Sequence, residues 1–433
     1  MSEKIYDLLG VGIGPFNLSL ACLTDAITDM DAVYLDQKPN FNWHPGMMLE
    51  SAHLQTPFMA DLVTLADPTS RFSVLNYLKK KGKLYAFYIR EDFFLLRKEY
   101  NQYCQWACEQ LPSLQWNTRV ERVTRDEQRD CYCVDAVNTV SGERQQWLAR
   151  HLVLGTGPTP WMPDWIDTSL EQVVHSGHYL AKKEALQQLS AITVVGSGQS
   201  AAEIFYDLLQ DIDQHAYQLN WVTRAPRFFP LEYTRLTLEM TSPEWVDYFH
   251  ALPEAQRDRL NASQKNLYKG INESLINDIY ELLYRKDLDG PLAVSLCTDS
   301  GLVAMEANGT HGLTLTLSHQ VLQEEFSLAT DSVIMSTGYT YRPPEFLTPL
   351  MPLIEFDSQQ RYAVGRDYSI DRRHSLFVQN AELHTHGFVS PDLGMACYRN
   401  SVILRSILGR EVYPVEKKIA FQTFGLPKEA VHG

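Results

Sequence analysis

Two glycine-rich turns contain the residues best suited to bind a phosphate group. The first, GVGIGP at residues 10–15, follows the apolar run 5–9 and precedes a helix-like run at 18–23. Glycines let the backbone turn tightly and approach a pyrophosphate, and the N-terminus of the following helix attracts its negative charge. Proline replaces the third glycine of the G-x-G-x-x-G fingerprint. We therefore predict a variant dinucleotide-binding turn made by Gly10, Gly12, Gly14 and Pro15.

The second turn, GSGQSA at residues 196–201, matches the full G-x-G-x-x-A pattern. It follows the strand-like run 191–195 and precedes a helix-like run at 202–206. One such turn alone is a weak signal, but two turns with the same flanking elements are a much stronger one. The pattern predicts a second dinucleotide site that includes Gly196, Ser197, Gly198, Gln199 and Ser200.

The residue that ends the next predicted strand differs between the two units. Asp36 lies 26 positions after Gly10 (36 − 10), whereas Arg224 lies 28 positions after Gly196 (224 − 196). An acid at this place suits a free ribose 2′-hydroxyl, as in FAD or NAD, and an arginine suits the 2′-phosphate of NADP. We therefore predict FAD at the first turn and NADPH at the second.

These turns require an α/β fold with two Rossmann-like dinucleotide-binding domains. We expect an FAD-binding domain at residues 1–165, completed by residues 330–433, and an NADPH-binding domain at residues 185–330. Residues from about 228 to 290 lack alternating strand patterning and contain runs with helical spacing. We predict that this stretch is a small helical substrate insertion over the active site.

The composition excludes several other classes of protein. The chain has 433 residues and a formal net charge of −15, which argues against a nucleic-acid partner because such binding needs a basic face. A hydrophobic fraction of 45% is typical of a folded protein. No apolar run reaches the roughly 18 residues of a membrane span, and the N-terminus lacks the apolar core of a signal peptide. We expect a cytoplasmic enzyme.

The seven cysteines are an odd, scattered set, which indicates reduced thiols. None forms a C-x-x-C pair near a glycine turn, and this argues against a disulfide reductase. His384 and His386 lack a further cysteine or carboxylate at ligand spacing, so we predict no metal site. Oxygen or a simple electron acceptor remains as the oxidant.

Further motifs follow the first turn along the chain. They are FNWHPGM at 41–47, LQTPF at 54–58, FSVLNYL at 72–78, TGY at 337–339 and THG at 385–387. With the first turn, these motifs make nearly the whole chain resemble the N-hydroxylating flavin monooxygenases of siderophore biosynthesis. That family includes lysine, ornithine and diamine N-hydroxylases, and the resemblance is closest to the diamine (putrescine or cadaverine) enzymes.

The resemblance implies a reaction. In the family, NADPH reduces FAD, the reduced flavin and O2 form a C4a-hydroperoxide, and a neutral primary amine attacks its distal oxygen to give a hydroxylamine for hydroxamate siderophores. The cofactor does the oxidation while the protein supplies position, dryness and charge. No catalytic side chain is assigned. Because an alkyl amine has a pKa near roughly 10.4, the pocket must accept or generate its neutral form.

The resemblance also implies cofactor contacts beyond the two turns. Gln55 is expected near the isoalloxazine, and Val120 is expected to contact the adenine through its backbone. The segment after THG is expected to approach the flavin through Pro391, Asp392 and Leu393. The adenosine and pyrophosphate side of FAD is expected to contact Asp36, Gln37, Lys38, Trp43 and His44.

Departures from the family pattern indicate the substrate. The lysine that pairs with a substrate carboxylate in the amino-acid enzymes is replaced by Ala60. Two family asparagines fall at Leu238 and at Leu267, the latter with a one-residue shift to Asn266 left open, and a substrate-contacting serine falls at Gly394. Each change removes a group suited to an amino-acid head, and a desolvated carboxylate without partners binds poorly.

We therefore predict a diamine N-hydroxylase, with a lysine or ornithine N-monooxygenase as the alternative. An uncoupled NADPH oxidase or a non-catalytic flavin-binding protein is the alternative of another class. The far ammonium of a diamine could pair with Glu239 or Asp392. The expected partners are the amine, O2 and, as is frequent in the family, further copies of the chain. The predicted substrate-site residues are Ala60, Leu238, Glu239, Leu267 and Gly394.

Overall fold

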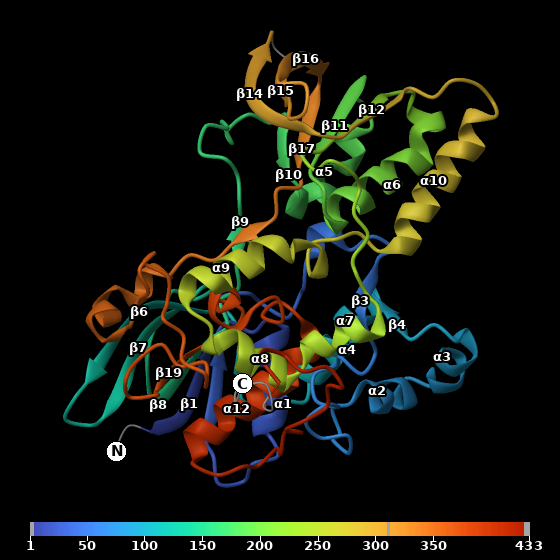
Figure 1. The fold of residues 1–433 in the computed structure, drawn as a ribbon. Helices are drawn as coiled ribbons and strands as arrows, with labels where there is room; N and C mark the ends of the chain where they lie inside the picture. The colour runs from blue at the N-terminus through green and yellow to red at the C-terminus, as the bar shows by residue number, and fades with distance from the viewer. Residues whose placement is uncertain (1–3, 310–311, 428–433) are drawn as a thin grey trace.

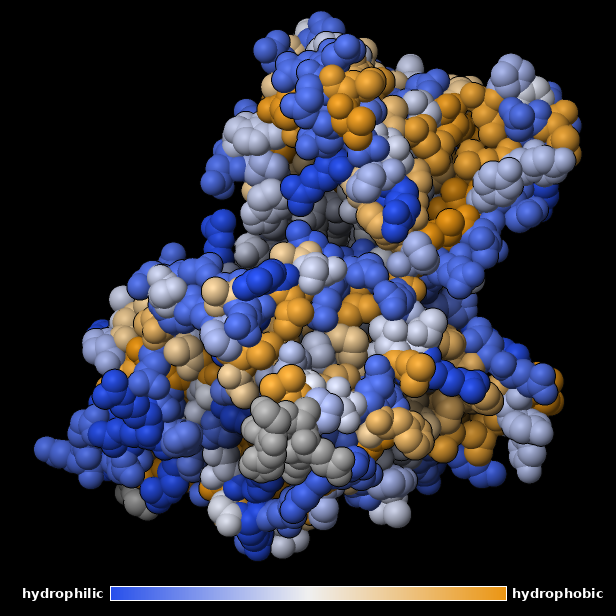
Figure 2. Space-filling model, in the orientation of Figure 1, coloured by the Kyte–Doolittle hydropathy of each residue, from blue (hydrophilic) through white to orange (hydrophobic). Residues whose placement is uncertain are grey.

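Two β-sheets, one in each half of the molecule, hold the two predicted turns (Figure 1). The computed structural model describes residues 4–309 and 312–427. The first three residues, part of the N-terminus on which we based the absence of a signal peptide, lie outside this range. The space-filling view shows two lobes that meet at a narrower waist (Figure 2).

The first sheet lies in the lower lobe and has the strand order β5-β2-β1-β8-β7-β6, with β19 paired to β8. β1 is parallel to β2 and to β8, and its C-terminal half is fully buried, as its apolar sequence predicts. β19 joins from the C-terminal part of the chain. The bounds are β1 Ile5–Val11, β2 Ala32–Leu35, β5 Leu114–Gln115, β6 Thr118–Asp126, β7 Cys131–Asn138, β8 Arg144–Leu154 and β19 Leu376–Val378.

The second sheet lies in the upper lobe and has the parallel strand order β10-β17-β11-β12-β13. The predicted range 185–330 leaves out β10 and β17, which pair within this sheet. An antiparallel sheet, β14-β15-β16, packs beside it. The bounds are β10 Val173–His175, β11 Ala191–Val195, β12 Gln218–Val222, β13 Val294–Cys297, β14 Ser300–Asn308, β15 Gly312–His319, β16 Glu324–Thr330 and β17 Ser332–Met335.

The chain crosses between the lobes along a short antiparallel pair, β9 (Thr159–Pro160) with β18 (Tyr339–Thr340). A second close approach lies nearby, because a Cβ at Gly46 would lie 1.9 Å from the Gly177 carbonyl oxygen. Only glycine fits at position 46 without moving one segment away from the other. The close approach of these two backbone segments therefore depends on the absence of a side chain at position 46.

The stretch predicted to be a helical insertion forms helices that touch both lobes. α8 and α9 pack on α11, beside the first sheet, and α10 packs on α6, beside the second (Figure 1). Ile279 of α10 is buried in the cluster that also contains Leu208 of α6. The bounds are α6 Gln199–His215, α7 Arg235–Leu238, η3 Glu239–Thr241, α8 Pro243–Ala251, α9 Glu254–Ser263, η4 Lys265–Leu267, α10 Glu273–Asp287 and α11 Leu383–His386.

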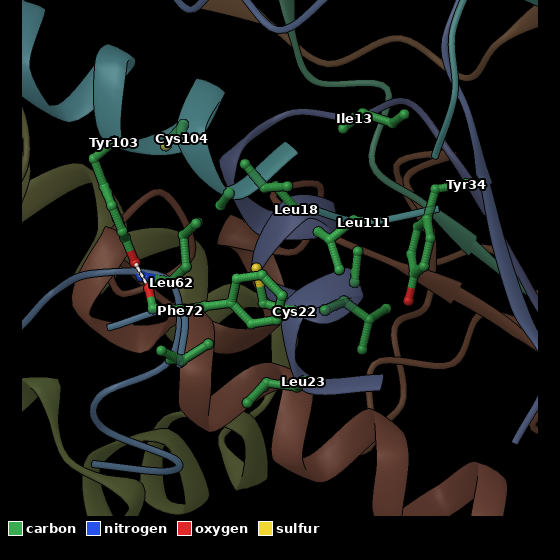
Figure 3. Close-up of a cluster of buried hydrophobic side chains, with 14 of the residues drawn as sticks. Ile13, Leu18, Cys22, Leu23, Tyr34, Leu62, Phe72, Tyr103, Cys104 and Leu111 are labelled. Carbon is green, nitrogen blue, oxygen red and sulfur yellow. Dashed lines mark hydrogen bonds between the residues drawn. The ribbon is translucent and has the colours of Figure 1, made fainter. Parts of the chain in front are cut away.

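The largest apolar cluster lies between the first sheet and the helices of the lower lobe (Figure 3). Tyr103 crosses it, donating a hydrogen bond to the Phe72 carbonyl (2.7 Å) and accepting one from Leu62 N–H (3.2 Å). Cys22 and Cys104 are buried here, and burial raises the pKa of both thiols well above its ordinary value. These two cysteines are therefore core residues whose thiols stay protonated and unreactive at neutral pH.

The remaining helices and strands connect these units. α1 and α12 pack against each other beside the first sheet, and α4 lies next to them (Figure 1). The bounds are α1 Pro15–Thr24, η1 Pro45–Met47, β3 His53–Pro57, α2 Val74–Lys80, α3 Leu84–Arg90, β4 Phe94–Leu96, α4 Arg97–Cys108, η2 Ser176–His178, α5 Tyr179–Leu186, η5 Glu345–Leu353, η6 Leu393–Met395 and α12 Ala396–Leu408. Within the described ranges, no helix is long and apolar enough to cross a membrane.

Candidate cofactor and substrate sites

The first glycine turn is open on one side and tightly packed on the other. A Cβ at Gly10 would lie 2.3 Å from the Tyr34 ring, and a Cβ at Gly12, which has φ +88°, would lie 2.5 Å from the Gly155 carbonyl oxygen. Gly14, the N-cap of α1, has no such neighbour within 4 Å. The first two glycines therefore serve packing, while the third leaves the helix N-terminus accessible to an anion.

Asp36 holds this turn in place from the end of β2. Its Oδ2 accepts a hydrogen bond from Ile13 N–H (2.7 Å), and its Oδ1 accepts one from Lys38 N–H (2.8 Å). The side chain is buried. Because each carboxylate oxygen can accept a second hydrogen bond, these contacts leave capacity for a ribose hydroxyl. The sequence predicted the acid but not its structural role in the turn.

Asn17 is a residue whose role sequence reasoning missed. It is fully buried, donates to the Gly12 carbonyl (2.8 Å) and accepts from Gln379 Nε2 (2.7 Å). It therefore ties the turn to the segment that follows β19. Gln379 Oε1 is buried without a hydrogen-bond partner in the part of the chain that the structure describes, as are Thr56 Oγ1 and Ser336 Oγ. Buried polar atoms of this kind require a partner such as a bound ligand or water.

The segment after β2 brings aromatic side chains to the waist. Trp43 packs edge-on against Tyr100 at 5.3 Å, and the Trp43 N–H donates to Asn101 Oδ1 (2.9 Å). His44 is left-handed (φ 49°), with its ring between Trp43 and Tyr339. His44 is exposed on one side, but burial of the rest of its ring lowers its pKa to about 4. The positive charges of Arg97 and Lys38 make a smaller contribution in the same direction. The imidazole is therefore neutral at physiological pH.

The second turn repeats the geometry of the first. A Cβ at Gly196 would lie 2.5 Å from the Ser336 carbonyl oxygen, whereas a Cβ at Gly198 would meet only the Lys269 carbonyl oxygen, at 3.6 Å. Gly198 is the N-cap of α6, which begins at Gln199. Trp221 Nε1 donates to the Gly196 carbonyl (2.8 Å) and fixes the turn against β12. In this turn the first glycine packs and the second leaves a helix N-terminus open.

Three cations gather beside the second turn. Arg224 is exposed just beyond β12, and Lys269 lies on the segment over Gly198. Burial lowers the pKa of Lys269, and the positive charges of Lys265 and Arg224 lower it further. None of the three has an ion-pair partner among the residues described. The sequence predicted Arg224 for a phosphate but missed the two lysines, because the segment at 265–269 reaches this turn only in the folded chain.

A chain of polar contacts joins the two lobes at the waist. Arg97, at the start of α4, makes two hydrogen bonds to Glu203 of α6 (2.9 and 2.7 Å) and one to the Met47 carbonyl (2.6 Å). Gln199 Nε2 donates to Glu203 Oε1 (3.0 Å). Both charged side chains are largely buried, at 12% and 4% exposed. This bidentate pair fixes α6, and with it the second turn, against the lower lobe.

Gln55 lies at the end of this polar chain. Its Nε2 donates to Asn272 Oδ1 (3.0 Å), and the Asn272 N–H donates to Gln199 Oε1 (2.9 Å). Gln55 belongs to β3 of the lower lobe, whereas Gln199 begins α6 of the upper lobe. The structure therefore brings a residue predicted at the flavin next to one predicted at NADPH.

Two of the predicted substrate residues meet directly. A Cβ at Gly394 would lie 3.7 Å from the Ala60 Cβ and 3.2 Å from Asp392 Oδ1. Asp392 Oδ1 accepts a hydrogen bond from Gly394 N–H (2.8 Å). Leu267 packs on the neighbouring apolar cluster that contains Met395 and Phe388. Positions far apart in the sequence thus lie close together and form one wall, with small residues at positions 60 and 394.

Glu239 is engaged by the C-terminal segment. Its two oxygens accept the N–H groups of Phe421 (2.9 Å) and Gln422 (3.0 Å), and these hydrogen bonds, Phe421 first, lower its pKa. Glu244 holds the preceding turn of the segment in the same way, through the N–H groups of Ile419 and Ala420. Both carboxylates anchor the C-terminal segment. The two oxygens of Glu239 are occupied, whereas Glu244 binds through Oε1 and its Oε2 is buried without a partner in the part of the chain that the structure describes.

The other predicted residues lie apart from this wall. Leu238 ends α7, next to Glu239, and its carbonyl accepts from Thr241 Oγ1. Val120 lies in β6, at a β-bulge. Gln37 and Lys38 are exposed beyond β2, with the Lys38 carbonyl accepting from Asn117 N–H (2.9 Å). These last residues lie at the end of the sheet where the resemblance places the adenosine.

His384 and His386 do not form a joint site. His384 Nε2 bonds the Tyr362 carbonyl (2.7 Å), whereas His386 stacks on Tyr368 at 4.3 Å and is fully buried. Burial lowers the pKa of both imidazoles. Both histidines act as neutral packing residues.

The fold and the two turns define a protein with two dinucleotide-binding units. The chain belongs to the L-lysine 6-monooxygenase/L-ornithine 5-monooxygenase family, whose model matches residues 4–341. It is therefore a member of the flavin-dependent N-hydroxylating monooxygenases, as the motifs predicted.

Several relatives and solved structures cover nearly the whole chain. The FAD-bound cadaverine monooxygenase DfoA of the desferrioxamine pathway of Erwinia amylovora is 64% identical, with a TM-score of 0.97 over 98% of this chain and 99% of that one. The putrescine N-hydroxylase of Shewanella oneidensis is 55% identical over 98% of this chain and 85% of its own length. The ornithine N-hydroxylase KtzI of Kutzneria sp. 744 is 27% identical, with a TM-score of 0.86 over 94% of this chain and 99% of that one.

Proposed function

We propose that the chain N-hydroxylates a diamine, putrescine or cadaverine, for hydroxamate siderophore biosynthesis, with FAD, NADPH and O2. The observation that carries the proposal is that small residues stand side by side at positions 60 and 394, since a Cβ added to Gly394 would lie 3.7 Å from the Ala60 Cβ. This wall offers no cation or hydroxyl to a substrate carboxylate, and an unpaired, desolvated carboxylate is costly. A diamine has no carboxylate, so the same wall accepts it. The diamine hydroxylases among the relatives support this assignment.

The residues at the first turn fit FAD. The open N-terminus of α1 at Gly14 suits a pyrophosphate, and Asp36 retains acceptor capacity for a ribose hydroxyl. The orphaned polar atoms of Gln379 and Thr56 are available to a ligand that extends from the turn. When bound, the two cofactors supply the redox chemistry that transfers one oxygen atom of O2 to the amine nitrogen.

The residues at the second turn fit NADPH. The N-terminus of α6 suits its pyrophosphate, and Arg224 with Lys265 and Lys269 suits its 2′-phosphate. The Arg97–Glu203 pair holds this turn at the lower lobe, which brings Gln199 to within hydrogen-bond reach of the Gln55 chain. The task of these residues is to orient the two cofactors toward each other and to keep their contact dry.

The proposal includes the division of the chain. One unit consists of residues 1–165 with 330–433, and the other of residues 185–330, extended by β10 and β17 because these strands pair in its sheet. A cytoplasmic location, where NADPH is available, and assembly into homo-oligomers belong to the same proposal. Light scattering on the purified holoenzyme measures the assembly.

The test is a substrate panel with the purified holoenzyme. NADPH consumption and hydroxylamine formation are measured with putrescine, cadaverine, lysine and ornithine. We expect coupled turnover on one or both diamines, with kcat/KM at least about tenfold above that for lysine or ornithine. A factor of this size follows from leaving the amino-acid carboxylate without a partner. Higher turnover on lysine or ornithine would overturn the substrate assignment, and peroxide without hydroxylamine would support an uncoupled oxidase.

A variant tests the wall itself. Ala60→Lys restores the cation of the amino-acid enzymes beside Gly394. We expect diamine turnover to fall, because a second positive charge repels the substrate ammonium. Ala60→Met, which is similar in length and uncharged, separates this charge effect from simple filling of the pocket. An increase in diamine turnover with lysine at this position would contradict the role of the wall.

A further inference from the structure

A diamine in this pocket presents two different nitrogen atoms. The reacting amine must be neutral to act as a nucleophile, whereas the far amine keeps its ordinary pKa, near roughly 10.4, and stays an ammonium. A desolvated ammonium needs a charged or polar partner. The question is which carboxylate beside the wall of Ala60 and Gly394 has an oxygen free to meet it.

Three other carboxylates already bind parts of the chain: Asp61 beside Ala60, and Glu239 and Glu244 at the C-terminal segment. Asp61, next to Ala60, accepts hydrogen bonds from Val63 N–H (2.9 Å) and Thr64 N–H (2.6 Å) at Oδ1. Its Oδ2 accepts from Thr64 Oγ1 and Val74 N–H, both at 2.7 Å. Glu239 and Glu244 hold the backbone of the C-terminal segment. Asp61 and Glu239 therefore have both carboxylate oxygens engaged, whereas Glu244 is held through Oε1 and its buried Oε2 has no hydrogen-bond partner among the described residues.

Asp392 differs from Asp61 and Glu239 in having an unengaged oxygen, and it differs from Glu244 in its position, because its side chain approaches the place of a Gly394 Cβ beside Ala60. Its Oδ1 accepts from Gly394 N–H, whereas its Oδ2 accepts no hydrogen bond from any residue that the structure describes. The Asp392 N–H donates to the Val389 carbonyl (3.1 Å), which fixes the backbone of the turn before η6. The carboxylate is therefore held in place through Oδ1, and its Oδ2 is free to accept a hydrogen bond from a ligand. It lies on the same wall as Ala60, because both approach the position where a Gly394 Cβ would stand.

The charged and titratable groups around Asp392 leave it without a partner. Arg399, a cation whose charge lowers the pKa of Asp392, is 1% exposed, and its guanidinium binds Glu382 Oε1 (3.1 Å) and the Ser390 carbonyl (2.5 Å). Burial raises the pKa of the Tyr233 phenol, and the negative charge of Asp392 raises it further. Asp392 makes no ion pair with any described residue. Burial raises its own pKa, so a cation bound beside it would stabilise the charged form.

We propose that Asp392 binds the far ammonium of the diamine through Oδ2, with Oδ1 and the Gly394 N–H fixing its orientation. This inference rests on the proposed function, since it names the residue that recognises a diamine at that site. Asp392 is a binding residue and takes no part in oxygen transfer. Asp392 and Ala60 together account for the preference for diamines over amino acids. Asp392 attracts the far ammonium of a diamine, and Ala60 offers no partner to the carboxylate of an amino acid.

The test compares diamines with monoamines of the same length in the holoenzyme. Asp392→Asn keeps the shape and an oxygen acceptor for Gly394 N–H but removes the charge. We expect kcat/KM for putrescine and cadaverine to fall about 10- to 100-fold, mainly through KM, since a hydrogen-bonded charge contributes about that much. Butylamine and pentylamine, which lack the far ammonium, should change less than about threefold. Asp289→Asn, an exposed aspartate at the end of α10, is the control for loss of one negative charge.

The outcomes separate the two proposals. If wild-type enzyme prefers lysine or ornithine, both the function and the role of Asp392 are overturned. Wild-type enzyme that hydroxylates diamines supports the function. If Asp392→Asn then lowers monoamine and diamine turnover by the same factor, or changes neither of them, the proposed role of Asp392 is wrong while the function stands. Flavin content and unfolding temperature show whether the variant folds.

A second variant keeps the test decisive if Asp392→Asn does not fold. Asp392→Glu retains the charge but extends it by one methylene toward the substrate. We expect the ratio of putrescine to cadaverine kcat/KM to rise severalfold, because the shorter diamine then fits the shortened space. An unchanged ratio in a folded, flavin-loaded variant would overturn the proposal.

Discussion

The two glycine turns use the same backbone geometry but opposite charges. In each, one glycine packs against a carbonyl oxygen across the sheet, at 2.5 Å from a would-be Cβ, and a following glycine opens a helix N-terminus. The first turn is held by the carboxylate of Asp36, whereas the second faces Arg224 and Lys269. Backbone geometry therefore selects a dinucleotide, and the side chains from the next strand and the insertion select which one.

The connection between the two turns should produce the largest effect. Glu203→Gln removes the charge that pairs with Arg97 and leaves a largely buried guanidinium unpaired. Because breaking a buried ion pair from one side is costly, we expect a loss of about 3–5 kcal/mol in the free energy of unfolding. Urea unfolding of the holoenzyme, followed by tryptophan fluorescence, measures it.

A surface pair provides the control for this prediction. Glu121→Gln breaks the exposed contact with Arg119 in β6, at 3.1 Å. Exposed pairs contribute about 0–1 kcal/mol, so this variant should unfold almost as wild type does. Equal losses in the two variants would show that the waist pair does not join the lobes more firmly than a surface contact.

The packed and open glycines should respond differently to the same substitution. Gly12→Ala places a Cβ 2.5 Å from a carbonyl oxygen at φ +88°, and we expect a loss of about 2–4 kcal/mol in stability. Gly14→Ala meets no protein atom within 4 Å, so the fold should persist while FAD binding weakens. Thermal unfolding and flavin absorbance distinguish the two. A Gly14 variant that unfolds like the Gly12 variant would contradict this division of roles.

The charge difference between the turns predicts a smaller, nucleotide-specific effect. Arg224→Gln should raise KM for NADPH about 10- to 50-fold and leave KM for NADH unchanged, because only NADPH has the 2′-phosphate. Arg227→Gln is the matched control, since Arg227 lies three residues on and stacks over the Phe229 ring at 4.4 Å. Steady-state kinetics with both nucleotides measures the effect. An equal rise for NADH would assign Arg224 to a part of the nucleotide shared by the two cofactors.

The difference between local and distant contacts explains what the sequence could predict. The turns were predictable because a glycine requirement is local, and Ala60 and Gly394 were noticed because each departs from a family motif. The engaged state of Glu239 was not, since its partner Phe421 lies 182 positions away. The Arg97–Glu203 pair spans 106 positions and the Asn17–Gln379 contact 362. No period or spacing in the sequence encodes such pairings, which arise only when the two sheets and the insertion meet.

The pH dependence of nucleotide binding offers the finest distinction between the cations of the second turn. Burial first, then Lys265 and Arg224, lowers the pKa of Lys269, so its ammonium deprotonates below the ordinary value near roughly 10.4. The charged form binds phosphate, so NADP⁺ affinity should be full at low pH and fall severalfold as pH rises through that lowered pKa. Calorimetric titration from pH 7 to 10 measures the fall. Lys269→Gln should bind more weakly at pH 7 and lose the high-pH decline, whereas Arg224→Gln should bind weakly but keep it, because arginine does not titrate in this range. A decline that persists in Lys269→Gln would assign the titration to another group and leave Arg224 as the residue that distinguishes the second turn from the first.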